Sequence, residues 1–223
     1  MRTRPNMLIA EFSVFELISN ATYLVLAGVA LWGLYCIVVV WHRVGKKRFK
    51  NEDDQDAFLD QVLPMVDAGQ FENAANDCDN DTRALPQLIS LAGDNFQLGY
   101  KKTRQLLLDR FQRDVMKDLE YRLSWVNTVI KTAPMIGLFG TVFGMMGAFE
   151  KLATSSDVDP AELAGSIRVA LVTTACGLAI AIPLMIMMAS VNIRIEKMQD
   201  LIGSGLNRFL ASLKAGMNRR GIS

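Results

Sequence analysis

Three long apolar stretches without any Asp, Glu, Lys or Arg constrain this chain more than any other feature. They run from Leu17 to Trp41, from Thr132 to Phe149 and from Val169 to Ile193 in a chain of 223 residues. A helix needs about 20 mostly apolar residues to cross the hydrocarbon of a bilayer, because each residue advances it by roughly 1.5 Å. The second stretch reaches that length comfortably when Leu123 to Ile130 is added, which admits Lys131. The sequence therefore predicts an all-α polytopic membrane protein with three transmembrane helices.

Composition excludes several other classes of protein. Charged residues, 21% of the chain, cluster between the apolar stretches, and a soluble protein of this length could not cover three buried helices of this size. The net charge of +1 argues against nucleic acid as a partner. Cys36, Cys78 and Cys176 form no CxxC pattern and His42 is the only histidine, so we expect no disulfide framework, metal site or cofactor. We expect no enzyme, because no nucleophile with a base, carboxylate pair or phosphate loop is present.

The distribution of basic residues predicts the orientation of the helices. A dense basic cluster follows the first apolar stretch, from His42 to Lys50, and such clusters are retained on the cytoplasmic side. The loop after the second stretch is acidic and the tail after the third is basic, which fits an N-out, C-in topology. The expected segments are an amphipathic segment on the outer surface (1–16), transmembrane helix 1 (17–41), a cytoplasmic helical insert (42–124), transmembrane helix 2 (125–149), an outer loop (150–166), transmembrane helix 3 (167–193) and a cytoplasmic helical tail (194–223).

Helical apolar stripes continue outside the membrane. One begins near Leu106 in the insert and runs into the second transmembrane helix, and another continues from Ile195 to Leu213 after the third. Two membrane helices are thus expected to project far into the cytoplasm. An amphipathic stripe needs a surface to pack against, which is either the insert or neighbouring copies of the chain. The first transmembrane helix is expected to be a lipid-facing anchor.

Small residues recur at intervals of three and four in the second and third transmembrane helices. In lipid, small residues at this spacing let helix backbones approach closely. Each proline in these helices removes a backbone donor and leaves a carbonyl free to face the contact between them. The expected helix-packing positions are Gly137, Gly140, Gly144, Gly177, Pro134 and Pro183.

Three threonines, Thr141, Thr173 and Thr174, place hydroxyl groups among these small residues. The hydroxyls of Thr141 and Thr174 either bond only to carbonyls four residues earlier in their own helices, or they line a narrow polar seam that holds water or a partner helix. A hydroxyl does not titrate near pH 7, so the seam by itself carries no proton. Any proton-linked function needs a carboxylate from another chain.

Two stretches resemble the paired signatures of the MotA/TolQ/ExbB proton-channel family: APMIGLFGTVFGMMGAF (133–149) and ALVTTACGLAIAIP (170–183). The three-span plan resembles the ExbB and TolQ branch. This resemblance implies a pentamer in the bacterial inner membrane, whose outer side is the periplasm, around a pore that holds an ExbD- or TolR-like single-span subunit with a membrane Asp. It implies that proton flow drives relative motion and that a TonB- or TolA-like protein receives the work. The channel-facing threonines of the family match Thr141 and Thr174.

One position departs from the family pattern. Relatives carry a glutamate immediately before the ALxxTAxGL stretch, where this chain has Val169, preceded by Arg168. Arg168 either forms a periplasmic ion pair with Glu150 or Glu162 or extends to the lipid headgroups, and we favour the ion pair. Two functions stay open beside an ExbB/TolQ-like motor that energises outer-membrane transport or envelope processes. One is a non-conducting oligomeric membrane scaffold, and the other is a divergent motor for gliding or polymer transport.

Overall fold

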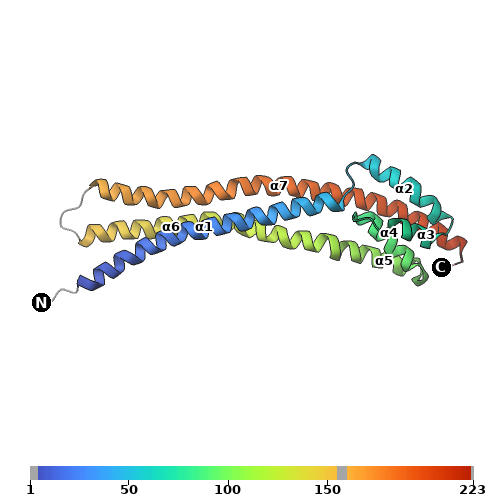
Figure 1. Ribbon diagram of the computed structural model, residues 1–223, viewed down its shortest axis with the longest axis horizontal. Helices are drawn as coiled ribbons and strands as arrows, with labels where there is room; N and C mark the ends of the chain where they lie inside the picture. Colours follow the sequence, from blue (N-terminus) through green and yellow to red (C-terminus); the bar gives the residue numbers. More distant parts are fainter. Residues whose placement is uncertain (1–4, 155–159, 222–223) are drawn as a thin grey trace. The chain divides into compact units, whose positions relative to one another are not determined.

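The computed structural model describes residues 5–154 and 160–221, without the side chains of residues 5–20, 151, 154 and 162. Every regular element in these ranges is helical: α1 (Pro5–Lys47), α2 (Glu52–Asp67), α3 (Phe71–Cys78), α4 (Ala84–Asp94), the 3-10 turn η1 (Phe96–Leu98), α5 (Tyr100–Arg110), the π-helical segment η2 (Phe111–Met116), α6 (Lys117–Thr154) and α7 (Pro160–Arg219) (Figure 1). Three helical stretches are long and apolar enough to cross a membrane, namely Ala21–Lys47, Tyr100–Glu150 and Leu163–Arg219. The predicted all-α class with three membrane-spanning helices is confirmed at this level.

The chain divides into two compact units. The first, which we call the apolar unit, comprises Met1–Ile37 and Leu123–Ala189. The second, the polar unit, comprises Val38–Arg122 and Ser190–Ser223. The helices α1, α6 and α7 each contribute residues to both units.

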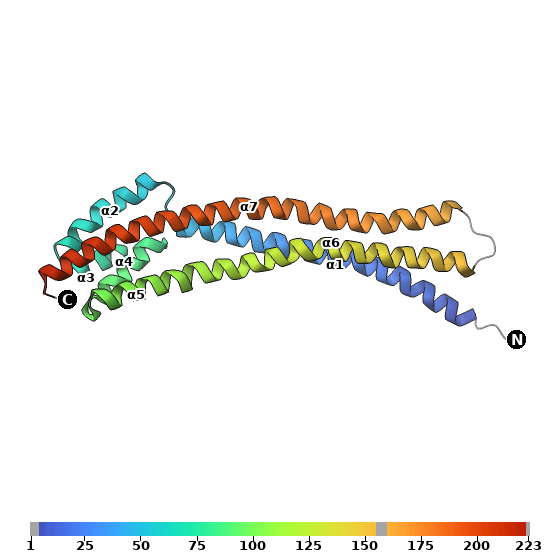
Figure 2. The ribbon, with the colours of Figure 1, turned by 180° about the vertical axis from the view of Figure 1, so that it is seen from behind.

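In the apolar unit, α1, α6 and α7 run side by side (Figures 1 and 2). Their contact buries a cluster made of Cys36, Ile37, Val126, Val129, Ile130 and Leu184. Gly33 permits this packing, because a Cβ there would lie 2.8 Å from Val129 Cγ1 and 2.9 Å from Leu184 Cδ1. Leu24 and Leu31 of α1 are 75% and 69% exposed. The expectation that the first span is a lipid-facing anchor therefore describes only one side of α1, because its other side is part of the bundle.

In the polar unit, the short helices of the insert cover the apolar stripe of α7. The most deeply buried residues of that stripe are Met198, Ile202, Phe209, Leu213 and Met217. The Nε2 atom of Gln55 in α2 donates to the carbonyl of Leu201 at 2.7 Å. Gly216 lies directly against the backbone carbonyl of Val66 in α2, so that a Cβ at this position would overlap with it. The sequence left two surfaces open as the cover of this stripe, the insert and a neighbouring copy of the chain. Within one chain, the insert covers it.

Arginines near the C-terminus of α7 attach it to the insert. Arg208 forms ion pairs with Asp56 and Asp60 of α2. The guanidinium carbon of Arg220 lies 5.3 Å from the centroid of the Phe71 ring. The ion pairs of Arg208 are exposed to solvent, so each contributes little to stability.

The end of α3 and the loop that follows it contain two groups with shifted pKa values, Cys78 and Asp81. Arg83 Nε lies 2.8 Å from Asp81 Oδ2, and the guanidinium carbon of Arg83 stacks 4.0 Å from the centroid of the Phe49 ring. Hydrogen bonding by Arg83 holds the pKa of Asp81 below its usual value. Burial, reinforced by the charges of Asp77 and Asp81, raises the pKa of the Cys78 thiol to about 12.

Two features of the backbone differ from a simple reading of the sequence. The expected boundary between residues 16 and 17 falls inside the unbroken helix α1, and that between 193 and 194 falls inside α7. The position of the membrane surface along a helix, and not the end of the helix, determines such a boundary, so the predicted limits of the transmembrane segments stay predictions. The amphipathic helix expected to run without interruption into the second span is also widened at η2. A π-helical turn holds an extra residue, and an apolar pattern with a period near 3.6 carries no signal for it.

Candidate functional site

Glycines bring α6 into contact with the backbone of α7. A Cβ at Gly137 would lie 2.7 Å from the carbonyl oxygen of Thr173, and a Cβ at Gly144 would lie 2.7 Å from Ala170 Cβ. On the facing helix, a Cβ at Gly177 would lie 2.5 Å from a carbonyl oxygen of α6. Any larger residue at these positions would force the helices apart. The structure thus places the three predicted glycines at the α6–α7 contact.

The fourth glycine, Gly140, also faces α1. A Cβ there would lie 2.7 Å from Thr173 Oγ1 and 3.1 Å from Thr22 Cγ2. Thr22 is only 5% exposed. It is not among the predicted site residues, because the sequence predicts a lipid-facing anchor for its span. A signal was available, since Thr22 follows the polar residues Ser19 and Asn20 within an otherwise apolar stretch. A third helix therefore contributes to the site.

Thr173 connects the two glycine-lined helices through its hydroxyl. Its side chain is 1% exposed, and its Oγ1 lies 2.9 Å from the Gly137 carbonyl oxygen of α6 and 2.7 Å from the Ala170 carbonyl oxygen of its own helix. The hydroxyl has one proton, so it donates to one of these carbonyls at a time. Thr173 can therefore exchange an intrahelical hydrogen bond for one between helices.

Thr141 bonds within its own helix. Its Oγ1 donates to the carbonyl oxygen of Leu138 at 2.6 Å, three residues earlier instead of the four that the sequence suggested. The side chain is 6% exposed. Of the two alternatives for Thr141, a hydrogen bond within its own helix or a place in a polar seam, the geometry of the chain shows the hydrogen bond within the helix.

Thr174 differs from both other threonines. Its Oγ1 is buried and has no hydrogen-bond partner among the described residues. Its Cα lies at the α6–α7 contact, 2.9 Å from where a Cβ of Gly137 would be. Leaving a buried hydroxyl unpaired costs about 1–3 kcal/mol, so this position stores an unfavourable free energy that a new partner can release.

The two prolines lie in different surroundings. Pro134 of α6 is half-buried, and its Cα would be 3.2 Å from a Cβ at Gly177. Pro183 of α7 is exposed. Both lie inside helices, where proline cannot donate to the carbonyl four residues earlier. The structure brings Pro134, but not Pro183, to the α6–α7 contact.

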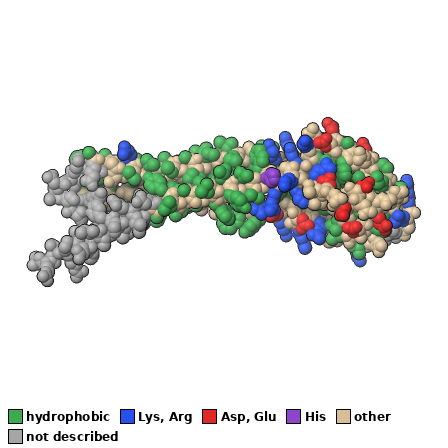
Figure 3. Space-filling model, in the orientation of Figure 1, with side chains coloured by type: hydrophobic (Ala, Val, Ile, Leu, Met, Phe, Trp, Pro, Cys, Tyr) green, Lys and Arg blue, Asp and Glu red, His purple; other side chains and the backbone are tan. Residues whose placement is uncertain are grey.

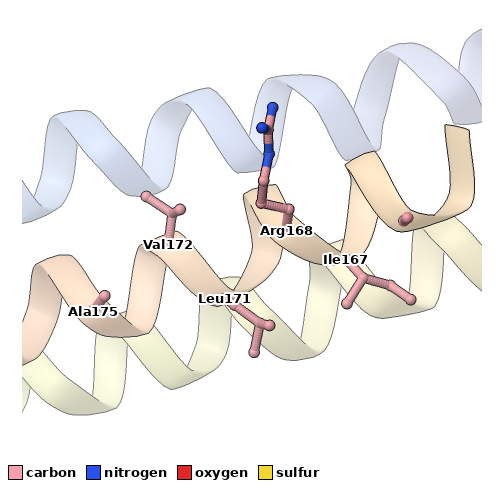
Figure 4. Close-up of a pocket in the computed structure, with 6 residues that line it drawn as sticks. Ile167, Arg168, Leu171, Val172 and Ala175 are labelled. Carbon is pink, nitrogen blue, oxygen red and sulfur yellow. The ribbon is translucent and has the colours of Figure 1, made fainter. Parts of the chain in front are cut away.

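An open groove lies along the first turns of α7. It is lined by Ala164, Ile167, Arg168, Leu171, Val172 and Ala175. In Figure 4, Arg168 and Val172 point to one side of α7, whereas Ile167 and Leu171 point to the other. Apart from Arg168 the lining is apolar, so this surface suits a hydrophobic neighbour.

The ion pair expected for Arg168 stays a prediction. The side chain of Glu162 lies outside the described residues, and Arg168 itself is exposed. The structure does show how its neighbour Val169 is held, since the hydroxyl of Tyr23 in α1 donates to the Val169 carbonyl oxygen at 3.3 Å. A tyrosine of α1 thus reaches the position at which the sequence departs from the family pattern.

Large apolar side chains remain exposed on both helices. In the apolar unit they include Met135, Phe139, Met146, Phe149, Leu171, Ile182, Met185 and Ile186. Such a surface is stable in contact with lipid tails or with apolar surfaces of other chains.

Comparison with known proteins identifies relatives of this chain. The sequence profile of the MotA/TolQ/ExbB proton channel family matches residues 96–203. The Tol-Pal system protein TolQ of Pseudomonas aeruginosa is 30% identical over 204 residues, which cover 82% of this chain and 84% of that protein. The biopolymer transport protein ExbB of Salmonella typhimurium is 29% identical over 163 residues, covering 72% of this chain and 66% of that protein.

A third relative is an ExbB homolog from Methanothermobacter thermautotrophicus, described as a biopolymer transport protein. It is 28% identical over 183 residues, and the match spans 81% of this chain but only 62% of the relative's length. The names of these relatives describe transport and a Tol-Pal system. With the three apolar helices, they indicate a bacterial inner-membrane protein. By its similarity to TolQ over most of both chains, the protein belongs to the MotA/TolQ/ExbB proton channel family.

Proposed function

We propose that this chain is an ExbB/TolQ-like subunit of an inner-membrane motor that is powered by the proton-motive force and energises outer-membrane transport or envelope processes. In this proposal the N-terminus is periplasmic and the C-terminus is cytoplasmic. The observation that carries it is the hydroxyl of Thr174, which is buried at the α6–α7 contact without a partner among the described residues.

The hydroxyl needs a partner that this chain does not supply within the membrane. None of the three apolar stretches contains an Asp or Glu. A single-span subunit of the ExbD or TolR type would bring a membrane Asp whose carboxylate accepts a charge-assisted hydrogen bond from Thr174 when ionised and only a weaker, neutral one when protonated. Thr141 and Thr173 would complete the proton pathway, and Thr173 can change its acceptor between two carbonyls.

The free energy released when one proton crosses the membrane is similar in size to that recovered when a buried hydroxyl gains a hydrogen-bond partner. One elementary charge that crosses 100 mV releases about 2.3 kcal/mol. Pairing a buried hydroxyl recovers about 1–3 kcal/mol. A single proton can therefore strengthen or weaken this contact and bias a small shift of the partner helix against α6 and α7.

We further propose that several copies of this chain assemble around the partner helix, as a pentamer by resemblance. The exposed apolar residues of α6 and α7 support oligomerisation, because they offer surfaces for neighbouring copies as well as for lipid. A TonB- or TolA-like protein would receive the motion. Gly137, Gly140, Gly144 and Gly177 would hold the α6–α7 contact that presents the threonines.

The test is proton flux in vesicles that contain this chain together with a co-purified single-span subunit. Thr174→Val should abolish partner-dependent flux while the two proteins still co-purify, whereas Thr174→Ser should retain flux because it keeps the hydroxyl. Thr128→Val is the matched control, since Thr128 is exposed on α6 and bonds to the Ser124 carbonyl of its own helix. Unchanged flux in Thr174→Val, or equal loss in Thr128→Val, would contradict the proposal.

A non-conducting scaffold is the second candidate, and it is favoured by Thr141 and Thr173, whose hydroxyls already bond to backbone carbonyls of this chain. It predicts that Thr174→Val changes nothing, while Gly144→Leu breaks assembly. A divergent motor for gliding or polymer transport is the third, and Val169 favours it. It predicts that flux depends on Thr174 but that no TonB- or TolA-like protein is bound.

A further inference from the structure

Basic side chains gather around the end of α1 in the polar unit. We define the basic belt as Arg43, Lys46, Arg48 and Lys50 together with Arg194 and Lys197 of α7. Figure 3 shows Lys and Arg side chains gathered in a band on the visible face of this unit. The proposed motor uses none of these residues.

A ring contact joins the two helices of the belt. The guanidinium carbon of Arg194 lies 3.7 Å from the centroid of the Trp41 ring, close enough for a cation–π interaction. Trp41 is 38% exposed and follows the exposed apolar residue Val38 on the same helix. Tryptophan is enriched where membrane hydrocarbon meets headgroups, so Trp41 marks the depth of that interface on α1.

Most of the positive charge of the belt is not neutralised within the chain. Arg43 is paired with Asp118, and the belt's neighbour Lys47 donates to the side-chain oxygen of Gln87 at 2.8 Å. Among the described residues, the exposed lysines Lys46, Lys50 and Lys197 form no ion pair. Asp118 is already engaged with Arg43. The acidic residues next to these lysines in the sequence are exposed and form no ion pair with them in the described part of the chain; they are Glu52, Asp53, Glu196 and Asp200.

We propose that the basic belt binds the phosphate groups of anionic phospholipids. A lipid satisfies both halves of the surface, because its phosphate meets Lys46, Lys50 and Lys197 while its acyl chains cover Val38. A soluble anion would satisfy only the charges. Each basic residue near a membrane surface strengthens attraction to anionic lipid by about fivefold at low salt, so a few lysines suffice for a clear preference.

Trp41 provides the reporter for the test. The full chain, carrying Trp32→Phe and Trp125→Phe so that Trp41 is the remaining tryptophan, is reconstituted in phosphatidylcholine vesicles. Brominated phosphatidylglycerol is titrated in, and its quenching of Trp41 is compared with that by brominated phosphatidylcholine. We expect the anionic lipid to be enriched severalfold next to Trp41, and the enrichment to fall at high salt because screening weakens surface electrostatics.

Charge variants separate this site from a general effect of charge. The test variant combines Lys46→Gln, Lys50→Gln and Lys197→Gln, and it should lose the enrichment, so that the two brominated lipids quench Trp41 almost equally. The control removes the same charge elsewhere in the polar unit, through Lys101→Gln, Lys102→Gln and Arg104→Gln, all exposed on α5, and should leave it unchanged. Replacing the three belt lysines with Arg keeps the charge and should preserve the enrichment, which guards against a folding defect in the Gln variant.

Three outcomes would overturn the proposal. The first is that brominated phosphatidylglycerol and brominated phosphatidylcholine quench Trp41 equally in the chain with an unsubstituted basic belt. The second is an equal loss of enrichment in the control variant. The third is loss of enrichment in sodium phosphate but not in sodium chloride of the same ionic strength, because the belt would then bind a soluble anion in place of a lipid.

Discussion

The strongest prediction concerns two neighbouring threonines that the same substitution should affect with opposite sign. Thr173 and Thr174 both lie at the α6–α7 contact, but only Thr173 has hydrogen-bond acceptors. We expect Thr174→Val to raise the stability of the chain without a partner subunit and Thr173→Val to lower it. The change removes a hydroxyl and adds a methyl group of similar size in both cases.

The magnitudes follow from the contacts. For Thr174, an unpaired buried hydroxyl costs about 1–3 kcal/mol, and its removal should recover part of that free energy. For Thr173, an interhelical hydrogen bond in a membrane protein contributes on average about 0.6 kcal/mol and at most about 1.7 kcal/mol. The two variants should therefore differ by at least about 1 kcal/mol.

The assay is equilibrium unfolding of the purified chain in mixed micelles of a mild detergent and sodium dodecyl sulfate, followed by circular dichroism. Measured without the single-span subunit, it reports the intrinsic packing of α1, α6 and α7. Destabilisation by Thr174→Val as large as that by Thr173→Val would show that the Thr174 hydroxyl is already paired. Thr174 would then have no unpaired hydroxyl to offer to a partner carboxylate.

Three further predictions concern the polar unit. Gly216→Ala should lower the free energy of unfolding by about 1–3 kcal/mol, because the added Cβ would overlap with a backbone carbonyl of α2. Gly203→Ala should raise the free energy of unfolding by about 0.5–1 kcal/mol, because a Cβ there meets nothing within 4 Å and alanine favours the helix. Denaturation in detergent measures both changes. Asp81→Asn should lower the melting temperature at neutral pH, and the difference from the unsubstituted chain should vanish as the pH falls below 3.8. The lowered pKa of Asp81 means that its contribution is present above the unfolded value of 3.8 and is lost as the folded carboxyl is protonated; a constant difference down to acid pH would contradict the role of Arg83. Burial raises the pKa of the Cys78 thiol to about 12, so only about one thiol in ten thousand is ionised at pH 8 in the folded chain. Cys78 should therefore resist iodoacetamide at pH 8 until the chain is unfolded. Complete labelling of the folded chain within minutes, measured by mass spectrometry, would refute this.

The sequence alone predicted the class of the fold and the presence of its membrane helices. Length and absence of charge are sufficient for this, because hydrocarbon excludes charged side chains and a helix must satisfy its own backbone. The glycine positions were also accessible, since small residues at helical spacing mark close contacts in lipid. The π-helical segment η2 was not, because it changes no residue type and little of the apolar pattern.

The roles of the individual hydroxyls required the tertiary structure. From the sequence, Thr141 and Thr174 looked equivalent, and Thr22 lay in a span regarded as an anchor. In the structure Thr141 bonds to its own helix, Thr174 is unpaired among the described residues, and Thr22 packs near Gly140. Which carbonyl a hydroxyl reaches depends on the rotation of each helix about its axis and on the depth at which helices meet.

The covering of the α7 stripe was decided in the same way. The spacing of apolar residues from Ile195 to Leu213 determined that this part of the chain forms an amphipathic helix with one face to bury. The sequence could not distinguish the insert from a neighbouring copy as the covering surface, because burial of apolar area has no direction. Close contacts made that choice, namely the Gln55 bond to the Leu201 carbonyl and the packing of Gly216 on α2. Periodicity specifies which face is buried, and only complementary shape and hydrogen bonding specify against what.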